Sequence, residues 1–376
     1  MVLGEARITE EGLADLRSRI GKIYNITPNR EAVTLDAIRR FADGIGDRNP
    51  LWTDPAYAAG TRFKANLAPP TFPFSVFLCS GNTVGGLPGV HGFFGGAEWE
   101  WSRRIYLDDV ISVTFRPTDV VEKDSSFAQR TVIVYGEAHY YTQRGELIAR
   151  TCGWTIRAER KAARERGKYS GIKKALYTSE ELAAIYEAQR KEQRRGGAPR
   201  YWEDVQEGEE LSPIVKGPLG IEEMVNYRGA CHSGESHVFR LRHMRRHPAW
   251  GFRDPRTGGL QSIGQVHEQD VAAGGAGIPS AYDLGPQRIC WLGHLVTTWM
   301  GDDGFLKKMY AEIRRFNMFG DTQWIKGKVA RKYLQDGERL VDLDIWAENQ
   351  RKEVTAPGRA TVWLPSLDVS TLPFHK

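Results

Sequence analysis

Two strand-rich stretches, each preceded by an apolar segment, constrain the fold of this chain more than any other feature. Residues 91–157 and 311–364 carry runs of β-branched and aromatic residues separated by turn signals, a pattern typical of antiparallel meanders. The apolar segments before them, 68–81 (APPTFPFSVFLCSG) and 283–300 (DLGPQRICWLGHLVTTWM), are predicted to form long helices. A helix this apolar must be covered, and a curved sheet can wrap it. We therefore predict an α+β fold with two long central helices, each wrapped by a curved antiparallel sheet.

The repeat divides the chain into three parts. We predict an N-terminal unit over 1–157, a charged helical crossover over 158–200 and a C-terminal unit over 201–376, with an insertion at about 240–260. Within the crossover, TSEELAAIYEAQRKEQRR has a Ser/Thr cap and helical spacing, which predicts an exposed helix. The basic runs of the crossover account for much of the net charge of +5. Because no aromatic residues are interleaved with the basic runs, we expect no nucleic-acid partner.

Composition narrows the class of protein further. At 376 residues with 41% hydrophobic and 26% charged residues, the chain is typical of a soluble globular protein. The longest apolar stretches are broken well short of about 18 residues, so we expect no membrane segment. The first residues lack the apolar core of a signal peptide, which favours a cytoplasmic location. The four cysteines form no CxxC pair, so we predict reduced thiols and no metal site.

A short acidic motif in the first unit points to a site. Residues 41–57 read FADGIGDRNPLWTDPAY, in which Asp47, Asn49 and Pro50 follow the end of an amphipathic helix and form a turn. This run resembles the hydratase motif of the MaoC-like (R)-specific enoyl-CoA hydratases and dehydratases, which reads Gly-Asp-x-Asn-Pro-Leu-His. The resemblance implies a double hotdog fold whose first half is of the FAS1-like dehydratase type. In that family the Asp and His position the water that adds across the double bond. Here Trp52 occupies the His position, so catalysis by Asp47 alone is in doubt.

The second half holds seven of the nine histidines, and the resemblance directs the search there. The segment 263–279 (IGQVHEQDVAAGGAGIP) is similar to the later part of the motif and places His267 in the imidazole position. Ser233-Gly234-Glu235 takes the place of small-Gly-Asp. We predict that His267 works with Asp270, Glu235 and His237, which the insertion would bring together. Each of these residues could instead be a solvated surface group or a structural hydrogen-bond partner. His91 and His294 lie on apolar segments and are interpreted as core histidines.

The resemblance also implies substrate contacts. Backbone N–H groups at the start of the second central helix, near Tyr282 and Gly285, are placed to stabilise the charge that develops on a thioester oxygen. Arg288 and Arg315 are candidates for the phosphates of coenzyme A, together with Arg314, Arg103 and Arg104. Asn49 and Trp52 are predicted substrate contacts from the first half. Trp52, with Phe72 and Phe74, is expected to line a wide apolar pocket for a bulky acyl group.

The leading hypothesis is an acyl-CoA hydratase or dehydratase, a lyase without metal or redox cofactor that meets coenzyme A as part of its substrate. One alternative is a thioesterase of the same fold, which would need an acid on the central helix. Another is a non-catalytic acyl-CoA-binding subunit of a heteromeric hydratase, favoured by the loss of His at position 52. We expect no membrane partner, and assembly into a homodimer or a higher homo-oligomer through sheet edges.

Overall fold

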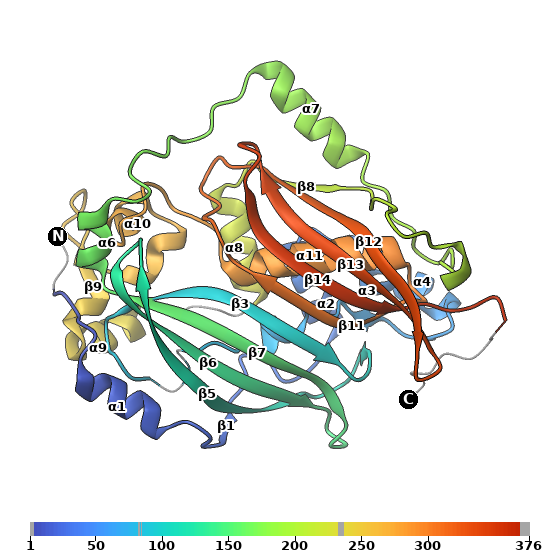
Figure 1. Ribbon diagram of the computed structural model, residues 1–376, viewed down its shortest axis with the longest axis horizontal. Helices are drawn as coiled ribbons and strands as arrows, with labels where there is room; N and C mark the ends of the chain where they lie inside the picture. The colour runs from blue at the N-terminus through green and yellow to red at the C-terminus, as the bar shows by residue number, and fades with distance from the viewer. Residues whose placement is uncertain (1–3, 82, 84, 232–236, 369–376) are drawn as a thin grey trace.

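The computed structural model describes residues 4–81, 83, 85–231 and 237–368. One ten-stranded antiparallel sheet, with five strands from each half, forms its centre (Figure 1). The strand order is β1-β5-β6-β7-β3 in the first half, continued by β11-β14-β13-β12-β8 in the second. The central strands β3 and β11 pair from Glu100↔Lys308 to Gly96↔Glu312, so the two halves share one sheet. The ten strands are β1 (Tyr24–Ile26), β3 (His91–Trp101), β5 (Ser112–Ser125), β6 (Gln129–Tyr141), β7 (Leu147–Ala158), β8 (Ile214–Lys216), β11 (Phe305–Glu312), β12 (Gln323–Gln335), β13 (Glu338–Asn349) and β14 (Val354–Trp363).

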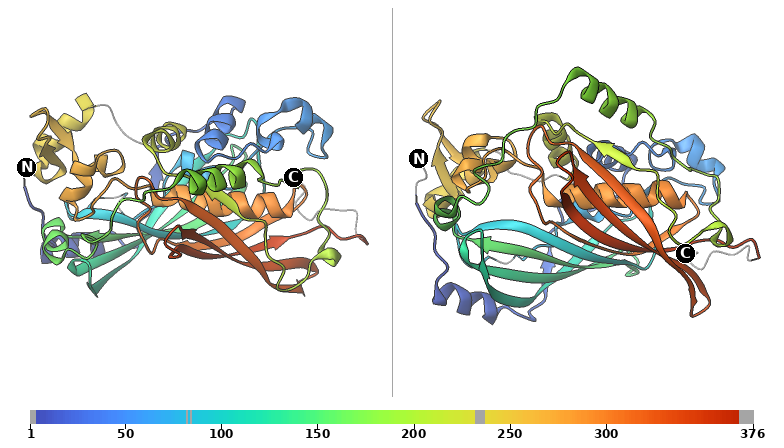
Figure 2. Two further views of the ribbon diagram at one scale, coloured as in Figure 1. Left: turned by 90° about the horizontal axis from the view of Figure 1, so that it is seen from above. Right: turned by 45° about the horizontal axis from the view of Figure 1, so that its top comes forward.

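Helices lie along one side of this sheet and around the ends of its strands. Figure 2 shows α11, α2 and α8 on the same side of the sheet. Two short antiparallel pairs, β2 (Leu67–Ala68) with β4 (Ile105–Tyr106) and β9 (Gly251–Arg253) with β10 (Leu260–Ser262), complete the strands. The helices are α1 (Glu10–Ser18), α2 (Leu35–Gly44), α3 (Pro50–Thr53), α4 (Pro55–Gly60), α5 (Pro73–Val76), α6 (Arg160–Arg166), α7 (Ser179–Arg190), α8 (Ile221–Ala230), α9 (His237–Arg246), α10 (Asp270–Gly275) and α11 (Gly285–Met300), with 3₁₀ turns at Trp202–Asp204, Pro248–Trp250 and Ile263–His267.

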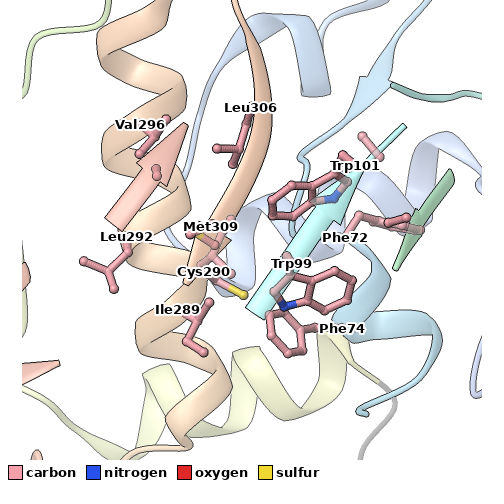
Figure 3. Close-up of a cluster of buried hydrophobic side chains, with 14 of the residues drawn as sticks. Phe72, Phe74, Trp99, Trp101, Ile289, Cys290, Leu292, Val296, Leu306 and Met309 are labelled. Atoms are coloured by element: carbon pink, nitrogen blue, oxygen red, sulfur yellow. The ribbon is translucent and has the colours of Figure 1, made fainter. Parts of the chain in front are cut away.

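The central helix predicted for the second half is confirmed as α11. It starts with Pro286 in its first turn, where the missing N–H costs nothing, and it ends at Gly301, whose φ of +72° suits glycine. Every residue from Pro286 to Met300 is buried. Figure 3 shows Ile289, Cys290, Leu292 and Val296 of this helix in one cluster with aromatic side chains of the first half, among them Trp99 and Trp101. The helix therefore fills the core shared by both halves.

The long helix predicted for the first half is wrong. Within 68–81 only α5, four residues long, is α-helical, and Phe77 is already extended. Two prolines precede α5, and a proline removes a helix N–H donor. After α5 the chain lies directly on the sheet: a Cβ added to Gly81 or Gly153 would come within 2.2 Å of the backbone oxygen of Val134 or Cys79, respectively. The backbone of this segment lies too close to the strands for the segment to be helical there.

The crossover follows the prediction more closely. α7 forms inside the predicted helical segment and carries a capping box, in which the Thr178 hydroxyl accepts from the Glu181 N–H and the Glu181 carboxylate accepts from the Thr178 N–H. The region predicted as an insertion contains the end of α9 and the β9 strand that pairs with β10. Among the helices of the described ranges, none is long and apolar enough to cross a membrane.

Candidate active site

A large cavity lies at the start of α11, lined by residues of both halves. Its volume is about 840 Å³. Strands of the first half, the crossover, the loop before α11 and the segment after β11 all contribute to its walls. Residues that line this cavity include Phe93, Phe94, Phe127, Trp154, Tyr169, His267, Tyr282, Gly285, Arg288, Arg315 and Phe316. Five predicted site residues of the second half border this one space: His267, Tyr282, Gly285, Arg288 and Arg315.

His267 is held in a defined orientation at the wall of this cavity. It ends the 3₁₀ turn Ile263–His267, and its Nδ1 lies 2.9 Å from the backbone oxygen of Tyr282. Because a carbonyl oxygen can only accept, Nδ1 carries the proton and Nε2 keeps its lone pair. Burial, together with the positive charge of Arg228, lowers the pKa of His267 to about 4 despite the opposing hydrogen bond to Tyr282. At neutral pH the imidazole is uncharged and can accept a proton at Nε2.

The start of α11 presents the Gly285 N–H at the cavity, because Pro286 has no N–H and the Gln287 N–H donates to the Leu284 backbone oxygen. The first turn of a helix has N–H groups without intrahelical partners, and the helix dipole makes this end positive. Gly285 is the first residue of α11, and a Cβ at this position would lie 2.9 Å from Phe94 and 3.1 Å from Ile313. Glycine is thus required by the close approach of both halves. The backbone here is placed to stabilise negative charge on a ligand in the cavity.

Tyr282 links the two halves at the same point. Its ring packs against His267 with 4.9 Å between ring centroids, and its hydroxyl lies 3.5 Å from Nε2 of His91 on β3. Burial lowers the pKa of His91 to about 3, so this histidine is also neutral. Tyr282 borders the cavity, as predicted for a substrate contact, although its phenol is turned toward His91.

A buried polar network fixes the start of α11 from below. The Arg288 guanidinium forms an ion pair with Asp283, with Nε 2.6 Å from Oδ2, and both side chains are at most 1% exposed. Asn317 also donates to Asp283, and Arg288 donates to the backbone oxygen of Arg315. Arg288 also borders the cavity, but its guanidinium donates to Asp283 and to backbone oxygens, and its contact with the phosphates of coenzyme A stays a prediction. Arg315 is exposed at the rim of the cavity and stays a prediction.

Of the two acidic residues predicted to work with His267, the structure describes Asp270, and the Asp270 carboxylate has other partners. The Asp270 carboxylate accepts from the Ser280 hydroxyl and the Ala281 N–H, and it pairs with Lys174. These bonds close the loop that follows α10, and they replace the predicted pairing of Asp270 with His267. Glu235 and the side chain of His237 lie outside the described residues, and their roles stay predictions.

The first-half motif forms a closed structure. Asp47 is buried, and it accepts hydrogen bonds from the Asn49 N–H and from Nε1 of Trp52 at 2.9 Å. Asn49 caps α3 through the Leu51 N–H and donates to Asp302. The cavity beside Asn49 and Trp52 has a volume of about 30 Å³, room for one or two water molecules. Asn49 and Trp52 border this small cavity, and their substrate contacts stay predictions. Trp52, Phe72 and Phe74 belong to the hydrophobic core, so the wide apolar pocket expected around them is corrected.

Sequence reasoning missed the partner of Asp47. Nε2 of His294, in the middle of α11, lies 3.4 Å from Oδ1 of Asp47 and 3.3 Å from Oε1 of Glu192 in the crossover. Lys216 is close by, donating to the backbone oxygens of Ile45 and Gly46. A histidine inside an otherwise apolar buried helix needs a polar partner, and this requirement was the available signal. The group ties the first half, the crossover and α11 together away from the large cavity.

Comparison with known proteins places this arrangement in a family. A family model described as the FAS1-like dehydratase domain region matches residues 18–151. A UPF0336 protein of Streptomyces avermitilis is 33% identical over 129 residues, which make up 33% of this chain and 83% of the relative. A solved structure of a MaoC-like dehydratase superposes with a TM-score of 0.65 at 17% identity, covering 93% of this chain and 99% of the other. The chain belongs to the family of the UPF0336 relative, with a FAS1-like dehydratase region in its first half, and its fold is that of a MaoC-like dehydratase.

The fold prediction is confirmed by the same comparisons. A protein from Mycobacterium tuberculosis that is described as having a double hotdog fold matches with a TM-score of 0.55 at 10% identity, covering 92% of this chain and 96% of that one. This protein has the same double hotdog fold, but in its first half the four-residue helix α5 stands in place of a long central helix. Membership of this family supports chemistry of the hydratase and dehydratase type.

Proposed function

We propose that this protein adds or removes water across the 2,3-double bond of an acyl thioester in the cavity at the start of α11. The observation that carries the proposal is the neutral imidazole of His267, fixed by Tyr282 with Nε2 free, at the wall of a cavity of about 840 Å³. The cavity beside the first-half motif, lined by residues of both halves, has a volume of about 30 Å³ and is too small for an acyl group. The second half is therefore the half proposed to be active.

In the hydration direction, Nε2 of His267 accepts a proton from a water molecule as its oxygen bonds to C3 of the enoyl group. The electron pair of the double bond moves toward the thioester, and negative charge develops on the thioester oxygen. The Gly285 N–H, at the positive end of the α11 dipole, stabilises this charge. A proton then returns to C2, and the neutral imidazole is restored. Glu235 is the proposed carboxylate partner that helps to hold the water.

The rim of the cavity supports coenzyme A as the carrier. Four basic residues border the cavity: Lys123 of the first half, Lys168 of the crossover, and Arg314 and Arg315 of the second half. Positive side chains at a rim can pair with the phosphates of coenzyme A while the acyl group enters the cavity. The size of the cavity favours a bulky acyl group over a short one.

Two other functions are less well supported. A thioesterase of this fold would need an acid on the central helix, and α11 carries no Asp or Glu. A non-catalytic binding subunit is favoured by the closed first-half motif, in which Trp52 has replaced the imidazole. Turnover by the isolated chain would exclude this second possibility.

The test is hydration of a panel of 2-enoyl-CoA thioesters by the purified chain, followed as loss of the absorbance of the conjugated thioester. We expect turnover without added metal or redox cofactor. Tight binding of the thioesters with no turnover of any of them would refute the proposal and favour the binding-subunit function.

The pH dependence of this turnover tests the role of His267. Because the pKa of His267 is lowered to about 4, the base is neutral throughout the range from pH 5 to 7. We expect kcat/KM to be nearly constant over this range and to fall below it with a midpoint near 4. The same lowered pKa costs stability as the pH falls from about 6.5 toward 4, so rates are corrected for the folded fraction. A midpoint near 6.5, the usual value for an exposed histidine, would contradict the assignment.

The first-half motif gives a second prediction. Asp47→Ala removes the acceptor of Trp52 Nε1 and the Asn49 N–H, and we expect it to lower the free energy of unfolding by roughly 2–4 kcal/mol. We expect kcat/KM per folded molecule to change less than about 3-fold, because Asp47 does not border the large cavity. Urea unfolding and the hydration assay measure the two quantities. Asp43→Ala, at an exposed position of α2, is the matched control. A 100-fold loss of turnover in folded Asp47→Ala would place catalysis in the first half.

A further inference from the structure

Five aromatic side chains from five separate segments converge on one end of the large cavity. They are Phe93 of β3, Phe127 of the β5–β6 turn, Tyr169 of the crossover, Tyr282 before α11 and Phe316 after β11. The tip of the β5–β6 hairpin and α6, which precedes Tyr169, lie at the same end of the sheet (Figure 1). We call this group the aromatic wall.

The rings of the aromatic wall meet mostly edge to face. Phe316 lies 5.6 Å from Phe93, 5.0 Å from Tyr169 and 4.8 Å from Tyr282, measured between ring centroids, at interplanar angles between 66° and 88°. Phe93 and Phe127 are 5.4 Å apart at 80°. Edge-to-face packing of this kind extends naturally to one more ring, because each ring presents an edge or a face to its neighbour.

The aromatic wall is not fully covered by the protein. Tyr169 and Tyr282 are buried, whereas Phe93, Phe127 and Phe316 keep part of their surface exposed, and all five border the cavity. Exposed aromatic surface inside a cavity is unfavourable in water and is covered when an apolar ligand binds. The uncovered rings therefore mark a subsite for an apolar group.

The position of the aromatic wall relative to His267 sets where that group lies on a substrate. The His267 ring is 4.9 Å from the Tyr282 ring, which is 4.8 Å from the Phe316 ring. The subsite thus begins two side chains away from the reacting imidazole. A ring joined to C3 through one or two methylene groups spans this separation, whereas a short straight chain does not reach it.

We propose that the preferred acyl group carries an aromatic ring one or two methylene groups beyond the double bond, and that the aromatic wall binds this ring edge to face. The proposal rests on the proposed function, since it places the double bond at His267. It goes further by selecting an aromatic ring over a saturated ring or a straight chain of the same number of carbons.

The experiment compares three 2-enoyl-CoA thioesters with eleven acyl carbons each: 5-phenylpent-2-enoyl, 5-cyclohexylpent-2-enoyl and undec-2-enoyl. We expect kcat/KM for the phenyl compound to exceed that of each of the others by roughly 10-fold, the size expected for two edge-to-face ring contacts. Equal values for phenyl and cyclohexyl, or a preference for the straight chain, would overturn the proposal while leaving the hydratase function in place.

A variant pair tests the aromatic wall directly. Phe93→Leu/Phe316→Leu keeps apolar side chains but removes two rings, and we expect it to lower kcat/KM for the phenyl compound by roughly 10-fold more than for the undecenoyl compound, so that the phenyl preference is lost. Phe239→Leu, at an exposed position of α9, is the matched control and should keep the preference. An unchanged preference in the double variant would refute the role of the aromatic wall.

Binding separates this proposal from the proposed function. Calorimetric titration with saturated 5-phenylpentanoyl-CoA and 5-cyclohexylpentanoyl-CoA needs no turnover. Tighter binding of the phenyl compound by the wild type, lost in the double variant, would support the ring subsite even if no thioester were hydrated. Equal binding of both compounds would overturn it.

Discussion

Replacing His267 by Ala is expected to lower kcat/KM for enoyl-CoA hydration by at least about 100-fold, the usual effect of removing a general acid or base. The reason is the free lone pair at Nε2, which follows because Nδ1–H donates a hydrogen bond to the backbone oxygen of Tyr282. Among the described residues, His267 is the one histidine that borders the large cavity. The measurement is the hydration assay, with circular dichroism to confirm that the variant is folded.

Two further variants separate catalysis from structure. His267→Asn can still donate to the Tyr282 carbonyl but offers no base at the Nε2 position, so we expect it to fold like the wild type and to be as inactive as the Ala variant. His243→Ala, at an exposed position on α9, should retain full activity. Activity of His267→Asn within a few fold of the wild type would show that His267 only anchors the loop before α11.

The sequence predicted a helix or strand correctly where the conformation of a segment depends on that segment's own residues. The apolar run 283–300 became α11, and the strand-rich stretches became the sheet. The prediction failed at 68–81 because that segment is apolar in the same way but lies flat on the strands. What decides its conformation is the close approach made possible by Gly81 and Gly153, and Gly153 lies far away in the chain. Hydrophobicity alone does not reveal such a contact.

The candidate site shows the same limit. The resemblance at 263–279 identified His267, and the position of α11 in the sequence identified Gly285, because both depend on local sequence. The ion pair of Arg288 was not foreseen, since its partners, Asp283 and the backbone of Arg315, are brought to it only by the tertiary fold. For the same reason the meeting of Asp47, His294 and Glu192, from three parts of the chain, was not foreseen.

The buried pair beneath the site leads to the prediction with the largest effect on stability. Arg288→Met removes the cation that faces Asp283, and we expect the free energy of unfolding at pH 7 to fall by about 3–5 kcal/mol. Burial already raises the pKa of Asp283, and the charge of Arg288 opposes this rise. Without Arg288 the carboxylate becomes a buried charge with Asn317 as its remaining side-chain donor among the contacts described above.

The sign of the pH dependence distinguishes this mechanism from a simple loss of packing. In Arg288→Met the pKa of Asp283 should rise further above its unfolded value, so the lost stability is partly regained at pH 4–5, where the carboxyl is protonated, and is lost again as the pH rises. Asp283→Asn in the same chain removes the charge and should recover part of the loss at pH 7. Arg150→Met breaks an exposed pair with Glu100, 53% and 42% exposed, and should cost less than about 1 kcal/mol. Urea unfolding at pH 5 and 7 measures all four proteins. A loss in Arg288→Met that is independent of pH and unchanged by Asp283→Asn would show that the guanidinium acts there through its volume and not through its charge.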